Sequence, residues 1–511
     1  MKDNLNNNNI ILNDKTNIIT INADDLGYGD LSCYGATKVH TPNIDKLAKE
    51  GRKFNDAHAA SAVCSPSRYG MLTGRYPLRR NFWGPIGDNQ GLTIDTNHLT
   101  LANLLKGVGY STAAIGKWHL GFGEEQPDWN KTLKPGPLEL GFDYFFGVPI
   151  VNSIPPYVYV ENHHVFGLDP NDPFVYGQES VTEKWPEKGS YNFIGGAKKA
   201  HQLYKDEMVG TTLTEKSIAW LKNADRNKPF FLYLATLNIH HPFTPSPRFK
   251  GTSQCGLYGD FIHELDWMVG EIVKTVEELG QTDNTLIIFT SDNGAMLNQG
   301  GQNAWKAGHK LNGNLLGFKF GAWEGGHRIP FIAKWPKKIP ADTTCNALLC
   351  HTDLMATFAS ITGRNLSKNE GLDSIDQLEN FINHTDTPIR EELVISPNSP
   401  KHLFIRKGKW VYIPAQNEGG FCGKGIGEHT LGGAAAFVLT GQKNSDYNQN
   451  GERLSNAPPA QLYNLEDDPS QEKNVYNEHP LIVKELETQL NKHRATIGPE
   501  PKLGWINLDN A

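Results

Sequence analysis

The sequence lacks the features that would assign it to a membrane, nucleic-acid-binding or secreted class. No run of about 20 apolar residues is present, so no membrane-spanning helix and no membrane partner are expected. The net charge of −7 leaves no excess of Lys and Arg for binding a nucleic acid. The polar stretch MKDNLNNNNIILNDKTN has no apolar core of the signal-peptide type. As written, the sequence predicts a cytoplasmic protein, or a periplasmic or secreted one if a leader was removed.

Cysteine is also scarce, with six residues scattered over 511 positions and no C-x-x-C pair. This spacing argues against a zinc finger and against a disulfide-stabilised scaffold. A chain of this length buries a large core without disulfides, so most of the cysteines are expected to be free, buried thiols. Cys345 and Cys350 are close enough in sequence to permit a pair, and the sequence leaves that pairing open.

Apolar runs of strand type alternate with helical patterns along the first three quarters of the chain. Strands are predicted at 17–22, 111–115, 230–234 and 285–290, and helices at 42–51, 100–107 and 262–279. This alternation predicts a mainly parallel sheet that is covered by helices on both faces.

The pattern changes after residue 395. A hairpin turning at Lys407-Gly408 is followed by a Gly- and Asn-rich, loop-like stretch over 415–460, a strand at 461–465 and a helix at 480–494. We therefore predict three parts: a polar tail over 1–16, a large α/β domain over 17–395 and a smaller α+β subdomain over 396–511.

Four polar clusters follow predicted strands of the large domain. Ligands bind beyond the carboxyl ends of the strands in sheets of this kind, so the four clusters are expected to meet at one edge. They are Asp24-Asp25, Lys117 to His119, His240-His241 and Asp292-Asn293. The carboxylate and amide oxygens of the first and last clusters suit a hard cation such as Ca²⁺ or Mg²⁺. Taken singly, each of these pairs is equally well explained as a turn at a strand end.

Two further stretches carry a family resemblance. Residues 64–75 read CSPSRYGMLTGR, which resembles the type I sulfatase signature C-x-P-x-R through its L-T-G-R ending. Residues 109–119 read GYSTAAIGKWH, which resembles the second signature of the same family. Two signatures in the expected order outweigh the alternative that Cys64 is only a buried cysteine in a Ser/Pro turn.

The resemblance implies a sulfuric ester hydrolase with an alkaline-phosphatase-like α/β sandwich, whose large, mostly parallel sheet is joined to a C-terminal subdomain with an antiparallel sheet. It also implies that a formylglycine-generating enzyme oxidises Cys64 to formylglycine. The aldehyde hydrate of that residue provides one hydroxyl to attack sulfur and a second to expel sulfate, a form of covalent catalysis. One Ca²⁺ per chain is implied, with ligands matching Asp24, Asp25, Asp292, Asn293 and residue 64.

Five cationic positions match residues that line the sulfate-binding pocket of the family: Arg68, Lys117, His119, His240 and Lys319. Arg68 would hold the formylglycine, and the two lysines would bind sulfate as point charges. His119 would accept the proton of the second hydroxyl, and His240 or Lys319 would protonate the leaving alcohol. His240 is favoured over its neighbour His241, for which we expect a wall or substrate contact.

The substrate is predicted from softer features. Segments 247–251 and 259–267 resemble the branch of arylsulfatase A and N-acetylgalactosamine-6-sulfatase, and many bacterial members of that branch resemble polysaccharide sulfatases. Arylsulfatase A-like relatives carry a Ser two residues after a G-x-P turn, where this chain has Val151, so Asn152 or Ser153 would have to replace that contact. Aromatic and histidine side chains, among them Trp83, Tyr157 and His163, are candidates for a sugar-binding rim, although packing explains most of them as well.

The sequence thus predicts a sulfatase that acts on a sulfated saccharide. Two alternatives are a related phosphoester or phosphonate hydrolase and a catalytically inactive glycan-binding protein. The single set of metal ligands favours sulfate over phosphate, and the complete signatures argue against lost activity. The sugar, the position of its sulfate, the endo or exo action and the oligomeric state are not determined by the sequence.

Overall fold

The computed structural model of the chain describes residues 16–178, 194–384, 386–421 and 424–504. The predicted polar tail, apart from residue 16, lies outside the described residues, as does Cys422. The other five cysteines are all free, including Cys345 and Cys350, and only Cys33 among them is not buried. Among the described helices, none combines the length and apolar character that a membrane crossing requires.

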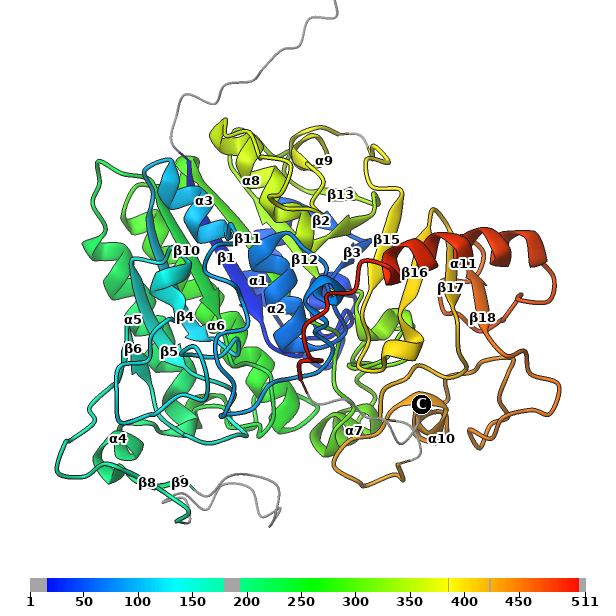
Figure 1. Cartoon of the computed structure of the whole chain (residues 1–511), viewed down its shortest axis with the longest axis horizontal. Coiled ribbons are helices and arrows are strands. Elements are labelled where there is room, and N and C mark those ends of the chain that lie inside the picture. Colours follow the sequence, from blue (N-terminus) through cyan, green and yellow to red (C-terminus); the bar gives the residue numbers. More distant parts are fainter. Residues whose placement is uncertain (1–15, 179–193, 385, 422–423, 505–511) are drawn as a thin grey trace, which may run out of the picture.

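A ten-stranded mixed sheet forms the centre of the molecule (Figure 1). Its strand order is β13-β2-β12-β11-β1-β10-β4-β5-β6-β7, and the five central strands from β11 to β5 run parallel. The strands are β1 (Asn17–Ala23), β2 (Arg52–Phe54), β4 (Ser111–Lys117), β5 (Tyr144–Val148), β6 (Val160–Glu161), β7 (His164–Val165), β10 (Phe230–Ala235), β11 (Thr285–Ser291), β12 (Phe331–Lys334) and β13 (Thr343–Cys345). The predicted mostly parallel sheet is confirmed.

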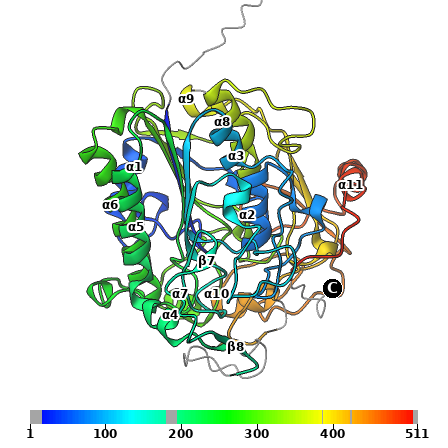
Figure 2. The same ribbon diagram turned by 60° about the vertical axis from the view of Figure 1, so that its left-hand side comes forward.

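Helices cover both faces of this sheet, as Figure 2 shows. One face packs against α1 (Pro42–Lys49), α5 (Val209–Asn223) and α6 (Leu257–Glu278), and the other against α2 (Cys64–Thr73), α3 (Leu101–Gly107) and α8 (Leu354–Thr362). Two separate hydrophobic cores result, because alternate residues of the strands point to opposite faces. In β1, Ile18 joins the core under α3 and α8, whereas Ile19 and Ile21 join the core under α1 and α6.

A small antiparallel sheet near the C-terminus has the order β15-β16-β17-β18. Its strands are β15 (Glu392–Ile395), β16 (Phe404–Lys407), β17 (Trp410–Ile413) and β18 (Gln461–Asn464), and α11 (Pro480–Arg494) packs against β16 and β17. The predicted hairpin and helix are therefore present. β15 directly precedes the boundary expected at residue 396, and the division into domains stays a prediction.

The remaining short elements lie in the connections. They are β3 (Ala57–His58) paired with β14 (Leu349–Cys350), β8 (Phe174–Tyr176) paired with β9 (Ile194–Gly196), and the helices α4 (Lys198–Leu203), α7 (Gln299–Lys306), α9 (Leu378–Ile382) and α10 (Phe437–Thr440).

Candidate active site

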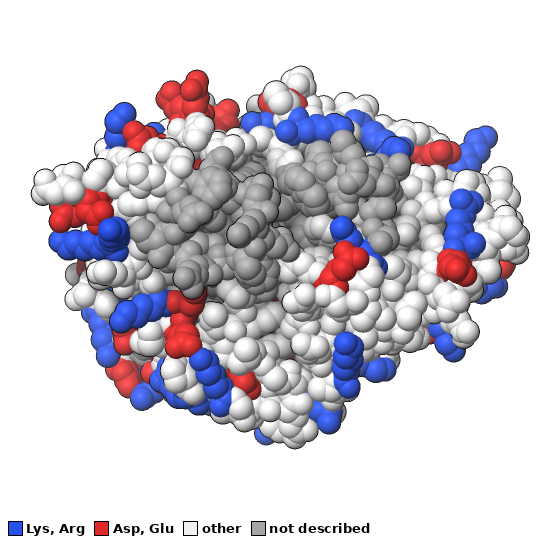
Figure 3. All heavy atoms as spheres, turned by 90° about the horizontal axis from the view of Figure 1, so that it is seen from below, with Lys and Arg blue, Asp and Glu red and all other residues white. Residues whose placement is uncertain are grey.

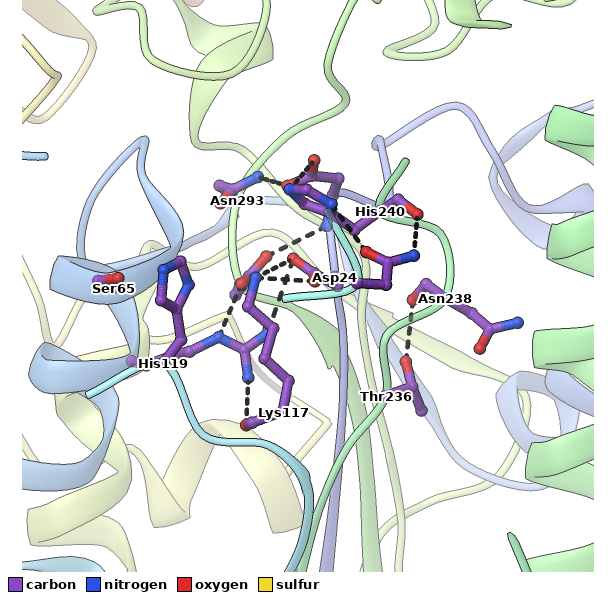
Figure 4. A network of polar contacts seen from close by, with 12 residues as sticks. Asp24, Ser65, Lys117, His119, Thr236, Asn238, His240 and Asn293 are labelled. Atoms are coloured by element: carbon purple, nitrogen blue, oxygen red, sulfur yellow. Dashed lines mark hydrogen bonds and ion pairs between the residues drawn. The ribbon is translucent and has the colours of Figure 1, made fainter. Parts of the chain in front are cut away.

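The polar clusters that follow the central strands meet at the carboxyl edge of the large sheet (Figure 4). Asp24 and Asp25 directly follow β1, Lys117 ends β4, and Asp292 directly follows β11. His240 lies five residues after β10 and reaches the same place. All of these side chains are buried, so their charges act on one another with little screening by solvent.

Lys117 and Asp24 form a close ion pair. The Lys117 Nζ donates to both carboxylate oxygens of Asp24 at 2.8 Å. Burial raises the pKa of Asp24 to about 7, with Lys117 lowering it and the carboxylates of Asp292 and Asp25 adding to the increase. A group of three carboxylates in one buried site therefore holds its negative charge only against a strong electrostatic penalty.

Arg68 forms the second ion pair, with Asp292. The Nε and Nη2 atoms of Arg68 donate to Asp292 Oδ2 at 2.9 and 2.7 Å, and Nη1 donates to the Lys117 carbonyl at 3.1 Å. The other Asp292 oxygen accepts from the backbone N–H of Asp25 at 3.2 Å. Arg68 thus fixes the ends of β4 and β11 relative to the helix that begins at Cys64.

Asp25 is the centre of the third group. Its Oδ1 accepts from Asn293 Nδ2 at 2.9 Å and from Lys319 Nζ, and its Oδ2 lies 3.7 Å from His240 Nε2. Burial opposes the ionised form of Asp25, but Lys319 and Lys117 outweigh it and lower the pKa of the carboxyl. The same ion pair raises the pKa of Lys319, because the charge of Asp25 outweighs the desolvation of the amine.

Two oxygens in this group accept no hydrogen bond although both are buried: Asp25 Oδ2 and Asn293 Oδ1. One carboxylate oxygen from each of Asp24, Asp25 and Asp292 also lies within 4.8 Å of the others. Buried oxygens without donors are costly unless a cation engages them. The donor set consists of oxygens alone, so these residues fit a hard divalent cation better than a transition metal.

A close approach of two loops positions Asn293. A side chain at Gly294 would place its Cβ 1.9 Å from the Gly325 carbonyl oxygen, so only glycine fits there. The Gly294 N–H donates to the Gly326 carbonyl at 3.0 Å. This contact holds the loop after β11 against the segment that carries Lys319 and Glu324.

Cys64 is the first residue of α2 and is buried, with the side chains of Val63, Met296 and Phe320 around it. Burial raises the pKa of its thiol, although Lys117 and Lys319 favour the thiolate. An unmodified Cys64 is therefore a poor nucleophile here, since the thiol form dominates at neutral pH.

His119 presents one nitrogen as a proton acceptor. Its Nε2 lies 3.0 Å from the Ile86 carbonyl oxygen, which can only accept, so Nε2 carries the hydrogen. The buried Nδ1 has no hydrogen-bond partner. Burial, with the charge of Lys117, holds the pKa of His119 well below its usual range, so the ring is neutral and its Nδ1 is available as a base.

Asn152, one of the two residues expected to replace the Ser of the relatives, contacts His240. Its Nδ2 donates to the His240 carbonyl at 3.1 Å, and its Oδ1 lies 3.2 Å from His240 Nδ1. His240 Nδ1 also donates to the His241 carbonyl at 2.6 Å, which leaves Nε2 facing Asp25. Burial, with the charges of Lys319 and Lys117, holds the pKa of His240 well below its usual range.

The side chains expected to form a sugar-binding rim have partners within the chain. His241 stacks on His240 with ring centroids 4.3 Å apart. Trp83 and Tyr157 are buried in hydrophobic cores, and Trp83 Nε1 donates to Asn81 at 2.7 Å. His163 pairs with Glu139 at 3.0 Å. Lys117 and His119 are equally buried, so burial does not separate a rim from a core here, and the sugar-binding rim stays a prediction.

The C-terminal part of the chain adds two side chains that the sequence reading did not identify. The His429 ring lies 4.6 Å from that of His241, and the Phe421 ring lies 4.6 Å from that of Phe320. Both residues belong to the Gly- and Asn-rich stretch that was expected to be loop-like. That stretch has no periodicity, so nothing in the sequence indicated that it reaches the site.

The chain is similar to several known proteins. The sulfatase family model matches residues 16–364. An N-acetylgalactosamine-6-O-sulfatase from Bacteroides thetaiotaomicron is 39% identical over 92% of both chains. The N-acetylgalactosamine-6-sulfatase of Sus scrofa is 36% identical over 73% of this chain and 67% of its own. A B. thetaiotaomicron protein whose structure is described under the metabolism of multiple glycosaminoglycans has a TM-score of 0.82 and 38% identity, covering 94% of this chain and all of that one.

Proposed function

Since this chain belongs to the sulfatase family and is therefore a sulfuric ester hydrolase, we propose that it removes the 6-O-sulfate of N-acetylgalactosamine residues in a sulfated glycosaminoglycan. The relative from B. thetaiotaomicron carries the proposal, because its name states this substrate and it matches nearly the whole chain. The partners in this proposal are the sulfated saccharide and the enzyme that converts Cys64 to formylglycine.

We further propose that Asp24, Asp25, Asp292 and Asn293, with the formylglycine at position 64, hold one Ca²⁺. The two buried oxygens that accept no hydrogen bond, on Asp25 and Asn293, support this assignment. A bound cation of this kind neutralises charge on sulfate oxygens and favours the ionised form of a nearby hydroxyl.

The formylglycine hydrate supplies one hydroxyl that takes the sulfate group from the alcohol oxygen and a second whose deprotonation releases sulfate and restores the aldehyde. In this scheme the residues of the chain bind, orient and move protons. Lys117 and Lys319 are buried cations whose charges act on Cys64, and they would attract the anionic sulfate group. Arg68 holds Asp292 and the Lys117 carbonyl, which keeps these groups in place around residue 64.

Candidate donors and acceptors of protons lie in the same site. The neutral ring of His119, with its bare Nδ1, suits the acceptance of the proton from the second hydroxyl. Lys319 is protonated because the charge of Asp25 raises its pKa, whereas burial keeps His240 neutral. A raised pKa makes an amine a weaker acid, so His240 and Lys319 both stay candidates for the donor to the leaving alcohol.

The test begins with protein co-produced with a formylglycine-generating enzyme and with a peptide mass that verifies the modification of Cys64. Sulfate release is then assayed on N-acetylgalactosamine 6-sulfate, its 4-sulfate isomer, galactose and glucosamine 6-sulfates, and matched phosphate esters. Release from the N-acetylgalactosamine 6-sulfate alone, or far faster than from the others, is expected. Preferential phosphate release by verified protein would support a phosphoester hydrolase instead, and preference for another sulfated sugar would overturn the proposed substrate.

A further inference from the structure

A second group of buried ligating side chains lies outside the active site. His58 ends β3, and Glu324 and His327 lie on the loop that leads into β12. One ligand atom from each of the three residues lies within 4.8 Å of the others, and all three side chains are fully buried. Two nitrogens and one carboxylate oxygen form a donor set that suits zinc rather than calcium.

The hydrogen bonds of the two histidines place an acceptor at the Nε2 atom of each ring and leave the Nδ1 atoms in contact with each other. His58 Nε2 lies 2.9 Å from Asp56 Oδ1, and His327 Nε2 lies 3.3 Å from the Ala322 carbonyl oxygen. Both oxygens are acceptors, so they bind an Nε2 that carries the hydrogen of a neutral ring. Arg406 Nη1 has two hydrogens and lies 2.7 Å from Asp56 Oδ1 and 3.2 Å from His58 Nε2, so His58 can also adopt the tautomer in which Nε2 accepts and Nδ1 carries the hydrogen.

The two Nδ1 atoms lie 2.9 Å apart. With both hydrogens on the Nε2 atoms, their lone pairs face each other, whereas a hydrogen on one Nδ1 forms a hydrogen bond between the rings. A metal ion is the other way to satisfy both nitrogens, and Zn–N distances of about 2.0–2.1 Å would draw the two rings slightly apart. A ring nitrogen that ligates a metal commonly has its other N–H bound to a carboxylate or a carbonyl, which is the pattern seen here.

Glu324 distinguishes between a hydrogen and a metal ion as the species between the two histidines. Its Oε2 accepts from Arg328 Nε at 2.7 Å, whereas its Oε1 is buried and has no hydrogen-bond partner. A proton shared by the histidines would leave this oxygen unsatisfied, while a metal ion would engage it together with the two nitrogens. A buried carboxylate oxygen without a partner is costly, which favours the metal.

The surrounding charges are compatible with a dication. Arg328 and Arg406 both contact Asp56, and Arg328 also neutralises Glu324. The two carboxylates and two guanidinium groups thus balance, so the ligands together present a neutral site, as the all-histidine sites of zinc enzymes do. We propose that His58, Glu324 and His327 hold a zinc ion that joins β3, the loop of Lys319 and, through Asp56 and Arg406, the small C-terminal sheet.

Zinc retention by the purified full-length chain tests this proposal. The protein is incubated with ZnCl₂ in a buffer that contains excess Ca²⁺, which occupies an all-oxygen site in preference, and is then desalted and analysed for metals. One zinc per chain is expected for the wild type, and little or none for His327→Asn and for Glu324→Gln. His493→Asn is the matched control, because it removes a histidine that lies outside the cluster and pairs with the carboxylate of Glu392, and it is expected to retain zinc like the wild type.

Cobalt substitution provides a readout that needs no variant. Co²⁺ in a site of nitrogen and oxygen ligands with low coordination number gives visible d–d bands, and the wild type is expected to show them at one equivalent. Wild-type protein that retains no more zinc than His327→Asn, or that binds no Co²⁺ with such bands, would overturn the proposal. The pair would then be held by a proton, and this result would leave the sulfatase assignment unaffected.

Discussion

At the scale of single residues, three buried carboxylates are each paired with one buried cation. Asp24 contacts Lys117, Asp292 contacts Arg68, and Asp25 contacts Lys319. The cluster is close to neutral by itself, so an added divalent cation would make it positive. A positive, buried site attracts a sulfate ester without any contribution from the surface. On the face at the carboxyl ends of the strands, Figure 3 shows Lys and Arg interspersed with Asp and Glu, with no broad area of one sign among the described residues.

Lys319→Ala is expected to lower kcat by on the order of a hundredfold or more, because it removes a fixed cation from the site where charge develops. The comparison is with Lys319→Arg, which keeps the charge and should retain more activity. The measurement is kcat and KM for N-acetylgalactosamine 6-sulfate with formylglycine-verified protein. Equal kcat values for Lys319→Ala and the wild type would contradict the proposed role of this lysine.

Metal removal tests the oxygen ligands. An ion that binds only the folded chain adds about 3 kcal/mol to the free energy of unfolding at a hundredfold excess over its Kd. We therefore expect chelation to lower both Tm and activity, and Ca²⁺ to restore both. Asp25→Asn should reduce the response to Ca²⁺. An unchanged melting curve, after elemental analysis has verified complete removal of the metal, would count against the calcium site.

The residues of this site were mostly predictable, and those of the substrate rim were not. Asp24, Lys117 and Asp292 could be assigned because each lies at a strand end, and the order of parallel strands then fixes where they meet. Trp83 and Tyr157 stay predictions, because an aromatic side chain in a loop has the same sequence signature whether it stacks on a ligand or packs in a core.

At the scale of secondary structure, the apolar pattern predicted four of the ten strands of the large sheet, β1, β4, β10 and β11, and three of the six helices that cover it, α1, α3 and α6. The helix expected over 262–279 begins five residues earlier, at Leu257. Its first turn contains Tyr258, Gly259 and Asp260, which do not follow the apolar periodicity, so the periodicity alone placed the start too late. The helix that begins at Cys64 was not predicted. Its Ser, Pro and Gly residues have low helix propensity, and all ten of its residues are buried, so tertiary packing determines it.

The start of α3 offers a test at this scale. Thr100 is the N-cap, where its Oγ1 accepts from the Asn103 N–H at 3.1 Å and donates to the Leu140 carbonyl. Thr100→Ala should lower the free energy of unfolding by about 1 kcal/mol, and Thr100→Ser by less. Urea unfolding measures both values, and sulfatase activity should not change. Equal stability of Thr100→Ala and the wild type would show that the cap is not required.

At the scale of the whole molecule, the C-terminal part of the chain is joined to the catalytic loops by a buried carboxylate. Glu418 accepts from the N–H groups of Gly433 and Phe318, and its carbonyl accepts from Ala322 at 2.8 Å. These bonds hold both sides of Lys319. Nothing in the sequence around Glu418 indicated this role, because the contact joins residues 100 positions apart.

Glu418 should make stability depend on pH. Burial raises the pKa of Glu418 from 4.5 to about 7. Between pH 4.5 and pH 7, the folded chain therefore keeps this carboxyl group protonated, whereas the unfolded chain has released the proton. The free energy of unfolding therefore falls by about 3 kcal/mol in total as the pH rises through that window. Urea unfolding at pH 5 and pH 8 should show a smaller decrease for Glu418→Gln than for the wild type. The same decrease in both proteins would contradict the assignment.

The central claim is sulfate ester hydrolysis that depends on an oxidised Cys64. The most direct measurement compares sulfate release from N-acetylgalactosamine 6-sulfate by wild-type protein, verified by peptide mass to carry formylglycine, with release by Cys64→Ala produced in the same way. The wild type should turn over, and Cys64→Ala should show no turnover above background while keeping the Tm of the wild type. Substantial turnover by folded Cys64→Ala would contradict the account.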